Sequence, residues 1–403
     1  MTSSMAFKQT YRFLLCIIFV GAVLGGLVTS CSPSADMEMV ANHSEAPIVE
    51  IKIASSRAAN GSALGNADAN YEEGTGLENY IGEGNKMRIY FFDSEDKYIC
   101  RFTTMTRADE ADGNGFSLKG FAPTELISYS QFKAVVLANW TNYQDNDLTP
   151  GVTTISDLVN KEWAKFNTLY AGMENLGLNP TKGRLMPFFG VHAYQDVAFR
   201  KGEVTTLAEP VKLLRAMAKI EVVFDNTSSD GTSLNTMAQL QSVTLCGYNT
   251  TGYCAPADVT KEGDYDHNGN HDYDYVHTLH LVGGANDASA SSQSILLQRV
   301  TKASATENEK WIGYVPEYQN LNTDNTPSDT RSYLKIKFGY QVPDDEYYQL
   351  DFAQYGDDGN PTSYFNIERN NLYRFTVKVA ERYKLAVDVK DWTNAFDNKF
   401  EFQ

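Results

Sequence analysis

Short stretches in which apolar and polar residues alternate recur along the chain and constrain its fold more than any other feature. The first of them is Ile48-Val49-Glu50-Ile51-Lys52-Ile53. A period of two is typical of a β-strand with one buried and one exposed face. Runs of Gly, Asn and Asp, which favour turns, separate these stretches. Helices and strands do not alternate as parallel α/β folds require. The sequence therefore predicts an all-β protein built from β-sandwiches.

The strand pattern runs through the first half of the chain and restarts near residue 208. In the first half, strands are predicted at 48–53, 86–93, 98–102 and 129–140. In the second half they are predicted at 213–226, 237–249, 332–342, 348–354, 371–381 and 383–392. We therefore expect two sandwich domains, residues 48–207 and 208–403. One helical patch is expected within 155–175, where four apolar residues share a face: Ile155, Leu158, Val159 and Trp163.

The N-terminal residues have the features of an export signal. Lys8 and Arg12 precede an uncharged run, Phe13 to Val28, of 16 residues. A membrane-spanning helix needs about 20 apolar residues, whereas the apolar h-region of a signal peptide is shorter. The run ends in Leu-Val-Thr-Ser-Cys31, which resembles the lipobox of bacterial lipoproteins, whose cysteine becomes the first mature residue and carries acyl chains such as palmitate. We predict a signal peptide over 1–30, lipidation at Cys31 and a flexible tether over 31–47, with a plain secretory signal as the alternative.

Charge and cysteine content narrow the function further. The formal net charge is −17, which argues against nucleic acid as a partner. Of the five cysteines, Cys16 lies in the signal and Cys31 is the predicted anchor. The remaining three are too few for a disulfide scaffold. Cys246 and Cys254 either bridge a hairpin or are two buried free thiols.

Six segments resemble the motifs of fimbrillins, the lipoprotein-derived type V pilins of Gram-negative anaerobes, and they occur in the family's order. The similarity covers most of residues 31–403, apart from 142–185 and 255–310. The segments are MRIYFFDSEDKY (87–98), FKAVVLANW (132–140), LLRAMAKIEVVFDN (213–226), YVPEY (314–318), NIERNNLYRFTVKV (366–379) and VDVKDW (387–392).

This resemblance implies two transthyretin-like sandwiches, exported to the cell outer membrane as a lipoprotein and assembled into a fimbrium. In the family, an arginine-specific, trypsin-like protease removes the first strand, and a strand from a neighbouring subunit fills the groove. The matching cut here is Arg57–Ala58, in a polar stretch without periodicity, because Arg88 and Arg101 lie inside predicted strands. The cut would also remove Cys31 and its lipid. The displaced strand would contribute Ile48 or Val49, with Ile51 and Ile53.

The C-terminal residues 384–403 are the candidate donor. Residues 384–392 are expected to close the sheet of their own domain, whereas 393–403, with Phe396, Phe400 and Phe402, are expected to be donated. The implied partners are other pilin subunits, the maturation protease and the outer membrane. The sequence identifies no host or bacterial receptor. Stalk, tip and anchor roles stay open, although Arg57 and the extended tail favour a stalk subunit.

One acidic segment resembles the first part of a calcium loop. Asp264, Asp266, Asn268 and Asp272 have the spacing of oxygen ligands around a central glycine, but Tyr275 stands where the bidentate glutamate is expected. A solvated turn is the favoured interpretation and a structural calcium ion the alternative. No other cofactor is predicted. The nearby histidines, which no cysteine or carboxylate completes into a zinc site, are interpreted as loop residues: His267, His271, His277 and His280.

No motif indicates catalysis. The chain has no G-x-S-x-G or H-E-x-x-H motif, no phosphate-binding loop and no dinucleotide fingerprint. We therefore predict a non-enzymatic protein. The alternative to a pilus subunit is a non-polymerising surface lipoprotein that binds glycans through aromatic residues such as Tyr340, Tyr347 and Tyr348.

Overall fold

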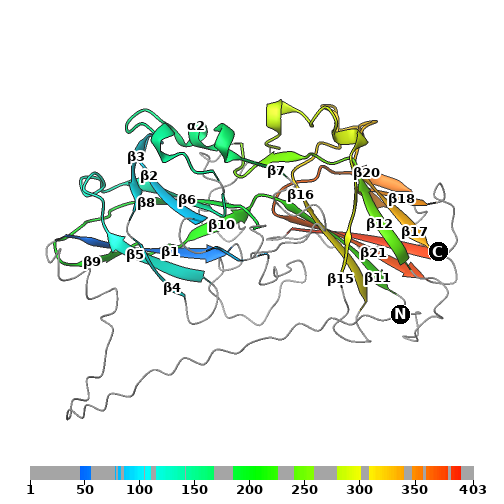
Figure 1. Cartoon of the computed structure of the whole chain (residues 1–403), viewed down its shortest axis with the longest axis horizontal. Helices are drawn as coiled ribbons and strands as arrows, with labels where there is room; N and C mark the ends of the chain where they lie inside the picture. Colours follow the sequence, from blue (N-terminus) through cyan, green and yellow to red (C-terminus); the bar gives the residue numbers. More distant parts are fainter. Residues whose placement is uncertain are drawn as a thin grey trace, which may run out of the picture. The chain divides into compact units, whose positions relative to one another are not determined.

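The computed structural model confirms the all-β fold class, since strands predominate and the helical segments are short (Figure 1). All of the residues that it describes belong to one compact unit, Glu45–Gln403. No helix among them is long and apolar enough to span a membrane. The described residues are 46–55, 78, 80–82, 86–103, 105–109, 115–140, 142–167, 185–225, 240–257, 279–300, 308–339, 347–356, 360–379 and 383–391.

The first half of the chain forms a nine-stranded sheet, in the order β3-β2-β6-β8-β10-β1-β5-β4, with β9 also paired to β1. Strand β10 joins two parts of this sheet, because Val211–Leu213 pair with β1 while Leu214 and Arg215 pair with β8. The strands are β1 (Ile48–Ser55), β2 (Met87–Phe92), β3 (Tyr98–Phe102), β4 (Thr106–Asp109), β5 (Gly115–Phe121), β6 (Phe132–Ala138), β8 (Phe188–Tyr194), β9 (Val204–Thr206) and β10 (Val211–Arg215).

The two parts of this sheet enclose one hydrophobic core. Figure 1 shows β2, β3, β6 and β8 on one level and β1, β4, β5 and β9 on another. Apolar side chains from both levels form a single cluster of buried residues, to which β1 contributes Val49, Ile51 and Ile53. A sheet that folds over in this way buries one face of β1, which explains the alternating sequence pattern there, whereas β2 and β6 are buried at almost every position.

The predicted helix over 155–175 is too long. The helix α2 (Ile155–Val159) begins at a capping box, in which Thr154 and Asp157 each bond the other's backbone N–H. It ends at Asn160 and is followed by a 3-10 turn, η3 (Glu162–Ala164), and the short strand β7 (Lys165–Asn167). The four residues expected to share a face are all buried, so the apolar pattern marked burial correctly but overstated helix length.

The second half of the chain forms a sandwich of two sheets, ordered β15-β16-β11-β21-β22 and β14-β12-β17-β18. Residues from both sheets make up a second hydrophobic cluster. Two-stranded pairs, β13-β7 and β19-β20, complete the described pairings. The strands are β11 (Ala218–Asp225), β12 (Leu240–Cys246), β13 (Thr251–Tyr253), β14 (Ser294–Leu296), β15 (Gln298–Val300), β16 (Glu309–Val315), β17 (Tyr333–Phe338), β18 (Tyr348–Asp351), β19 (Ala353–Tyr355), β20 (Pro361–Tyr364), β21 (Asn371–Val379) and β22 (Tyr383–Asp391).

The single strand predicted over 213–226 is wrong, because two strands occupy this segment. Strand β10 ends at Arg215 in the first sheet, and β11 begins at Ala218 in the second sandwich. The core cluster also changes here, since Met217 belongs to the first cluster and Ala218 to the second. The domain boundary near residue 207 stays a prediction, but β10, which follows it, pairs with β8 and β1.

Two further expectations concern the C-terminal strand and the cysteines. Strand β22 pairs antiparallel with β21 from Tyr383 to Asp391 and is the edge strand of its sheet. It therefore closes the sheet of its own sandwich, as expected for 384–392. Cys246 and Cys254 are buried free thiols, so the alternative of a disulfide between them does not hold.

Candidate functional site

The strand predicted to be removed, β1, lies in the interior of the first sheet and has partners along both sides. On one side, Ile48–Ala54 pair antiparallel with Phe121–Gly115 of β5. On the other side, Ile48–Glu50 pair parallel with β9 and Ile53–Ser55 with β10. The backbone N–H of Leu207, between β9 and β10, donates to the Glu50 carbonyl oxygen at 2.9 Å. A segment at the start of the described chain thus occupies a central place in the sheet.

Three alternate side chains anchor β1 in the core. Val49 and Ile51 have no exposed surface, and Ile53 is 2% exposed. Ile48 is half-buried, so Val49 is the buried member of the pair left open by the sequence. Burial of an aliphatic side chain of this size contributes about 1.5–3 kcal/mol. Together, the three contribute about 5–9 kcal/mol, a large part of the about 5–15 kcal/mol that stabilises a typical protein.

Loss of β1 would open a groove with unsatisfied backbone on both walls. Strands β5 and β9 and the first half of β10 would each lose the hydrogen bonds that pair them with β1. Unpaired N–H and C=O groups along a strand readily pair with another chain. The groove would also lack the three aliphatic side chains. The arrangement is chemically suited to accept a replacement strand with apolar residues at every second position.

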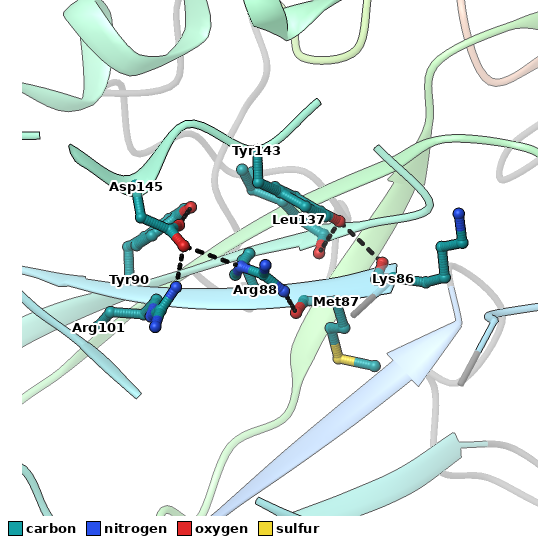
Figure 2. A network of polar contacts seen from close by, with 8 residues as sticks. All are labelled: Lys86, Met87, Arg88, Tyr90, Arg101, Leu137, Tyr143 and Asp145. Atoms are coloured by element: carbon teal, nitrogen blue, oxygen red, sulfur yellow. Dashed lines mark hydrogen bonds and ion pairs between the residues drawn. The ribbon is translucent and has the colours of Figure 1, made fainter. Parts of the chain in front are cut away.

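The predicted cleavage site, Arg57–Ala58, lies outside the described residues, and β1 ends two residues before it, at Ser55. The two arginines rejected from the sequence, Arg88 and Arg101, lie within β2 and β3. Figure 2 shows both guanidinium groups directed at Asp145. Nε of Arg88 lies 3.4 Å from Oδ2 of Asp145, and Nη1 of Arg101 binds the same oxygen.

Two tyrosines complete this cluster. The hydroxyl of Tyr90 donates to Oδ1 of Asp145 at 2.5 Å, and burial raises its pKa well above the usual value. The ring of Tyr143 lies against Arg88, 4.4 Å from the guanidinium carbon to the ring centroid (Figure 2). Because a protease binds its substrate as an extended and accessible segment, these paired strands are poor targets. The sequence-based rejection of both arginines agrees with this geometry.

An exposed arginine that lies outside the described strands, Arg200, was overlooked in the sequence analysis. Arg200 lies in the turn between β8 and β9, where its side chain is 73% exposed and 3.7 Å from the Glu203 carboxylate. Its carbonyl oxygen accepts a hydrogen bond from the backbone N–H of Glu203 at 3.2 Å. Within the described part of the chain, this turn is a competing site for an arginine-specific protease.

Glu78, the first described residue after β1, is fully buried. Its Oε1 lies 2.9 Å from Nζ of Lys219 and accepts a hydrogen bond from the hydroxyl of Tyr314 at 2.5 Å. These partners lie on β11 and β16 of the second sandwich. Burial, followed by the negative charge of Glu78, raises the pKa of Tyr314 well above its usual value. Lys219 also lies 3.8 Å from Glu221, whose Oε1 accepts from Nε of Arg374 at 2.6 Å.

The residues that follow Glu78 are fixed to the first sheet. Asn139, directly after β6, donates from Nδ2 to the carbonyl oxygen of Tyr80 at 2.7 Å and accepts at Oδ1 from the N–H of Gly82 at 2.9 Å. Asn139 is fully buried and has a positive φ of 61°, a conformation that asparagine tolerates better than most residues. The segment that begins at Glu78 is therefore held by the second sandwich through Glu78 and by the first sheet through Tyr80 and Gly82.

The remaining predicted site residues lie outside the described residues. They are the lipidation residue Cys31, the donor residues Phe396, Phe400 and Phe402, and the loop residues Asp264, Asp266, Asn268 and Asp272. Within the described part of the chain, no group of three His, Cys, Asp or Glu side chains is placed to hold a metal ion. A role for these residues stays a prediction.

No protein-family model and no curated protein matches the chain. Among solved structures, it is similar to a candidate cell adhesion protein from Parabacteroides distasonis, at 14% identity over 88% of this chain and 99% of that one, with a TM-score of 0.44. It is also similar to a fimbrial assembly protein from the same species, at 12% identity over 85% of this chain and 94% of that one, with a TM-score of 0.40. A third similarity is to candidate polysaccharide-binding proteins from Bacteroides thetaiotaomicron, at 14% identity over 89% of this chain and 100% of that one, with a TM-score of 0.38.

Proposed function

We propose that this chain is a structural subunit of a cell-surface pilus that serves adhesion. In this proposal it is exported as a lipoprotein anchored at Cys31, cut after Arg57 and assembled by strand exchange. The observation that carries the proposal is the place of β1: a strand at the start of the described chain, with Arg57 two residues beyond its end, lies in the interior of the sheet. An N-terminal segment that merely decorated the fold would not have partners on both sides.

The energetics require that the groove be refilled after cleavage. The three aliphatic side chains of β1 alone account for about 5–9 kcal/mol, and lost backbone hydrogen bonds add to this. A subunit with an empty groove would be close to unfolding or would pair with another chain. Strand exchange between subunits restores both the hydrogen bonds and the apolar contacts.

The proposed donor is the C-terminal tail of a neighbouring subunit. Strand β22 is already paired with β21 along its nine residues. The donated segment is therefore the one that follows β22, residues 393–403, with Phe396, Phe400 and Phe402 filling the groove. The partners in this proposal are other subunits of the pilus and an arginine-specific protease.

Treatment of the purified precursor with an arginine-specific protease tests the proposal. We expect a single new N-terminus at Ala58, followed by a ladder of polymers in mild SDS. The variant Arg57→Ala should abolish both, whereas the matched control Arg200→Ala should leave both unchanged. A new N-terminus at Lys201, or fibres in which every subunit keeps its lipidated N-terminus, would overturn the proposal.

A second candidate function is glycan binding by the uncleaved lipoprotein. It is favoured by two exposed tyrosines at the start of β18, the outermost strand of the four-stranded sheet, since Tyr347 is 39% and Tyr348 52% exposed. Against it, Nζ of Lys335 lies 4.6 Å from the ring centroid of Tyr347, and the ring of Tyr348 packs edge-on against Phe338. Glycan-array binding by the intact monomer, with no ladder after protease treatment, would favour this function instead.

A further inference from the structure

Three of the nine exposed large apolar side chains in the described part of the chain lie at one end of the first sheet. They are Ile127 (37% exposed), Tyr129 (36%) and Val204 (44%). Ile127 and Tyr129 belong to the loop between β5 and β6, and Val204 is the first residue of β9. We call these three residues the distal patch. Exposed apolar side chains that gather on one surface indicate a contact site, whereas single ones need no explanation.

Contacts between two connections bring the parts of the distal patch together. The carbonyl oxygen of Ser130, which ends the patch loop, accepts a hydrogen bond from the backbone N–H of Val197 at 3.0 Å. Val197 lies in the connection from β8 to β9 that leads to Val204. In the same connection, Phe199 stacks on Phe132, the first residue of β6, with 6.1 Å between ring centroids. The loop and the connection therefore form one surface.

The distal patch lies where β1 enters the sheet. Ile48, the first residue of β1, is paired with Phe121 on one side and Val204 on the other. Figure 1 shows β9 beside the start of β1. Since Val49 is buried in the core, alternation directs Ile48 and both of its partners to the outer surface. An apolar row of three residues thus crosses the entrance of the groove that loss of β1 would open.

The opposite end of β1 is close to the second sandwich of the same chain. Ser55, the last residue of β1, pairs with Leu213 of β10, and β11 begins five positions further on, at Ala218. Tyr314 of β16 and Leu372 of β21 also belong to the core cluster of the first sheet. The end of the groove that is accessible to a neighbouring copy is therefore the one beside the distal patch.

The length of the proposed donor tail requires the two copies to touch. Strand β22 ends at Asp391, and the twelve residues 392–403 follow it. Replacement of β1 uses eight of them, so four remain to connect the donor to the groove. Four extended residues span at most about 14 Å. The body of the donor, near the end of its β22, must then lie against the end of the groove at which its tail enters.

We propose that the distal patch is the docking surface for the second sandwich of a neighbouring copy, and that the donated strand enters the groove there and runs in the direction of β1. The docking surface presupposes the strand exchange proposed above and adds the contact surface and the direction of insertion. A strand in this direction repeats the pairing of β1, antiparallel to β5 and parallel to β9 and β10. The donor also takes the place of the chain that precedes Ile48, which cleavage removes.

Apolar contact suits this partner better than charge does. Each copy has a formal net charge of −17, so two copies repel each other at long range. The distal patch supplies one aromatic and two aliphatic side chains, and the same loop and connection carry exposed charged residues: Glu125, Asp196, Lys201 and Glu203. An apolar centre with a polar rim is the usual composition of a protein–protein interface. Tyrosine, here Tyr129, is enriched among the residues that dominate the binding energy of such interfaces.

The test compares the rate of ladder formation after cleavage in the wild-type precursor and in the variant Ile127→Ser/Tyr129→Ser. Both side chains are exposed, so the variant should keep the melting temperature of the precursor and yield the same new N-terminus at Ala58. Because docking precedes insertion of the strand, the ladder should form about tenfold more slowly, as expected for the loss of a dominant interface residue. An unchanged rate would overturn the proposal.

The variant Leu296→Ser/Val300→Ser is the matched control. These residues are 59% and 39% exposed and flank the crossing from β14 to β15, and β15 is the edge of its sheet opposite to β22. The control should form the ladder at the wild-type rate. Equal slowing in both variants would show a general effect of surface polarity and would refute a specific docking surface.

Cross-links between copies report the direction of insertion. In polymers assembled from unlabelled and nitrogen-15-labelled subunits, a cross-link between an unlabelled and a labelled peptide joins two copies. Lys201 lies beside the distal patch, Lys212 lies opposite Ala54 near the other end of β1, and Lys390 lies at the end of β22. We expect mixed links between Lys390 and Lys201. Mixed links between Lys390 and Lys212 instead would overturn the direction.

The wild-type protein separates failure of the docking surface from failure of strand exchange. If the wild-type precursor is cut before Ala58 but forms no ladder, strand exchange is refuted and the docking surface with it. If the wild-type ladder forms and the variant Ile127→Ser/Tyr129→Ser assembles equally fast, only the docking surface is refuted.

Discussion

The buried carboxylate of Glu78 is predicted to be the main anchor of the chain that follows the proposed cut. It is fully buried, and its partners Lys219 and Tyr314 are 3% and 7% exposed. Removal of one member of a buried ion pair typically costs about 3–5 kcal/mol, because the remaining charge stays buried without its partner. Lys219 still has Glu221 at 3.8 Å, so the lower end of this range is expected for Glu78→Leu.

Urea unfolding of the precursor and of the two single variants provides the measurement. Glu78→Leu should lower the midpoint without changing the slope, which would show that stability has changed and the extent of unfolding has not. Lys219→Met leaves two carboxylates, Glu78 and Glu221, near each other and should cost at least as much. The double variant Glu78→Leu/Lys219→Met should recover most of the loss, because apolar replacement of both partners is close to neutral.

The double variant decides whether the reasoning is right. If either single variant lowered the free energy of unfolding by less than about 1 kcal/mol, the pair would contribute no more than an exposed ion pair does. Additive losses in the double variant would show that the two side chains act independently. Either result would refute the view that the pair anchors residue 78. After cleavage at Arg57 the loss in Glu78→Leu should increase, since the covalent link to β1 no longer helps to hold this segment.

Three further predictions concern the first sheet and the second sandwich. Ile51→Asp should lower the free energy of unfolding of the precursor by about 3 kcal/mol or more, since it buries a carboxylate, whereas the exposed Lys52→Asp should change the melting temperature little. Asp145→Asn should cost about 1 kcal/mol in urea unfolding yet yield no new arginine cleavage product, because the two arginines of Figure 2 stay within paired strands. Burial raises the pKa of Glu317, but Arg369 and backbone N–H groups outweigh it and hold the pKa below the usual 4.5. The stabilisation of the fold by the ionised Glu317 carboxylate is complete above pH 4.5 and is lost as the pH falls through its lowered pKa. Arg369→Met should therefore make the urea midpoint less dependent on pH between 5 and 3.

Alternation in the sequence predicted the burial of Ile51 and Ile53 in β1, but it left open whether Ile48 or Val49 is buried, and it did not reveal long-range partners. The structure shows that Val49 is the buried residue. The break between β10 and β11 was missed because Ala216 and Met217 continue the apolar run, with no Gly or Pro to interrupt it.

The partners of Glu78 and His280 could not be read from the sequence for a different reason. Tyr314 is 236 positions from Glu78, and Asn160 is 120 positions from His280. Neither contact leaves a local pattern, because ion pairs and hydrogen bonds between distant segments depend on how the sheets pack. Both residues are polar and lie outside the predicted strands, where a solvated side chain is the usual expectation.

The anchors on either side of residues 56–77 differ in kind, and this difference bears on how a cut would act. Strand β1 is held by backbone pairing and aliphatic side chains, contacts that any strand with a suitable alternation reproduces. Glu78 is held by its ion pair, and Tyr80 and Gly82 are held by the hydrogen bonds of Asn139, contacts that depend on particular side chains. A cut between them would therefore separate a replaceable strand from a segment that keeps its specific partners. On this reasoning, the exact bond cut between 56 and 77 matters little for the folded remainder, and moving the arginine within that stretch should preserve polymerisation.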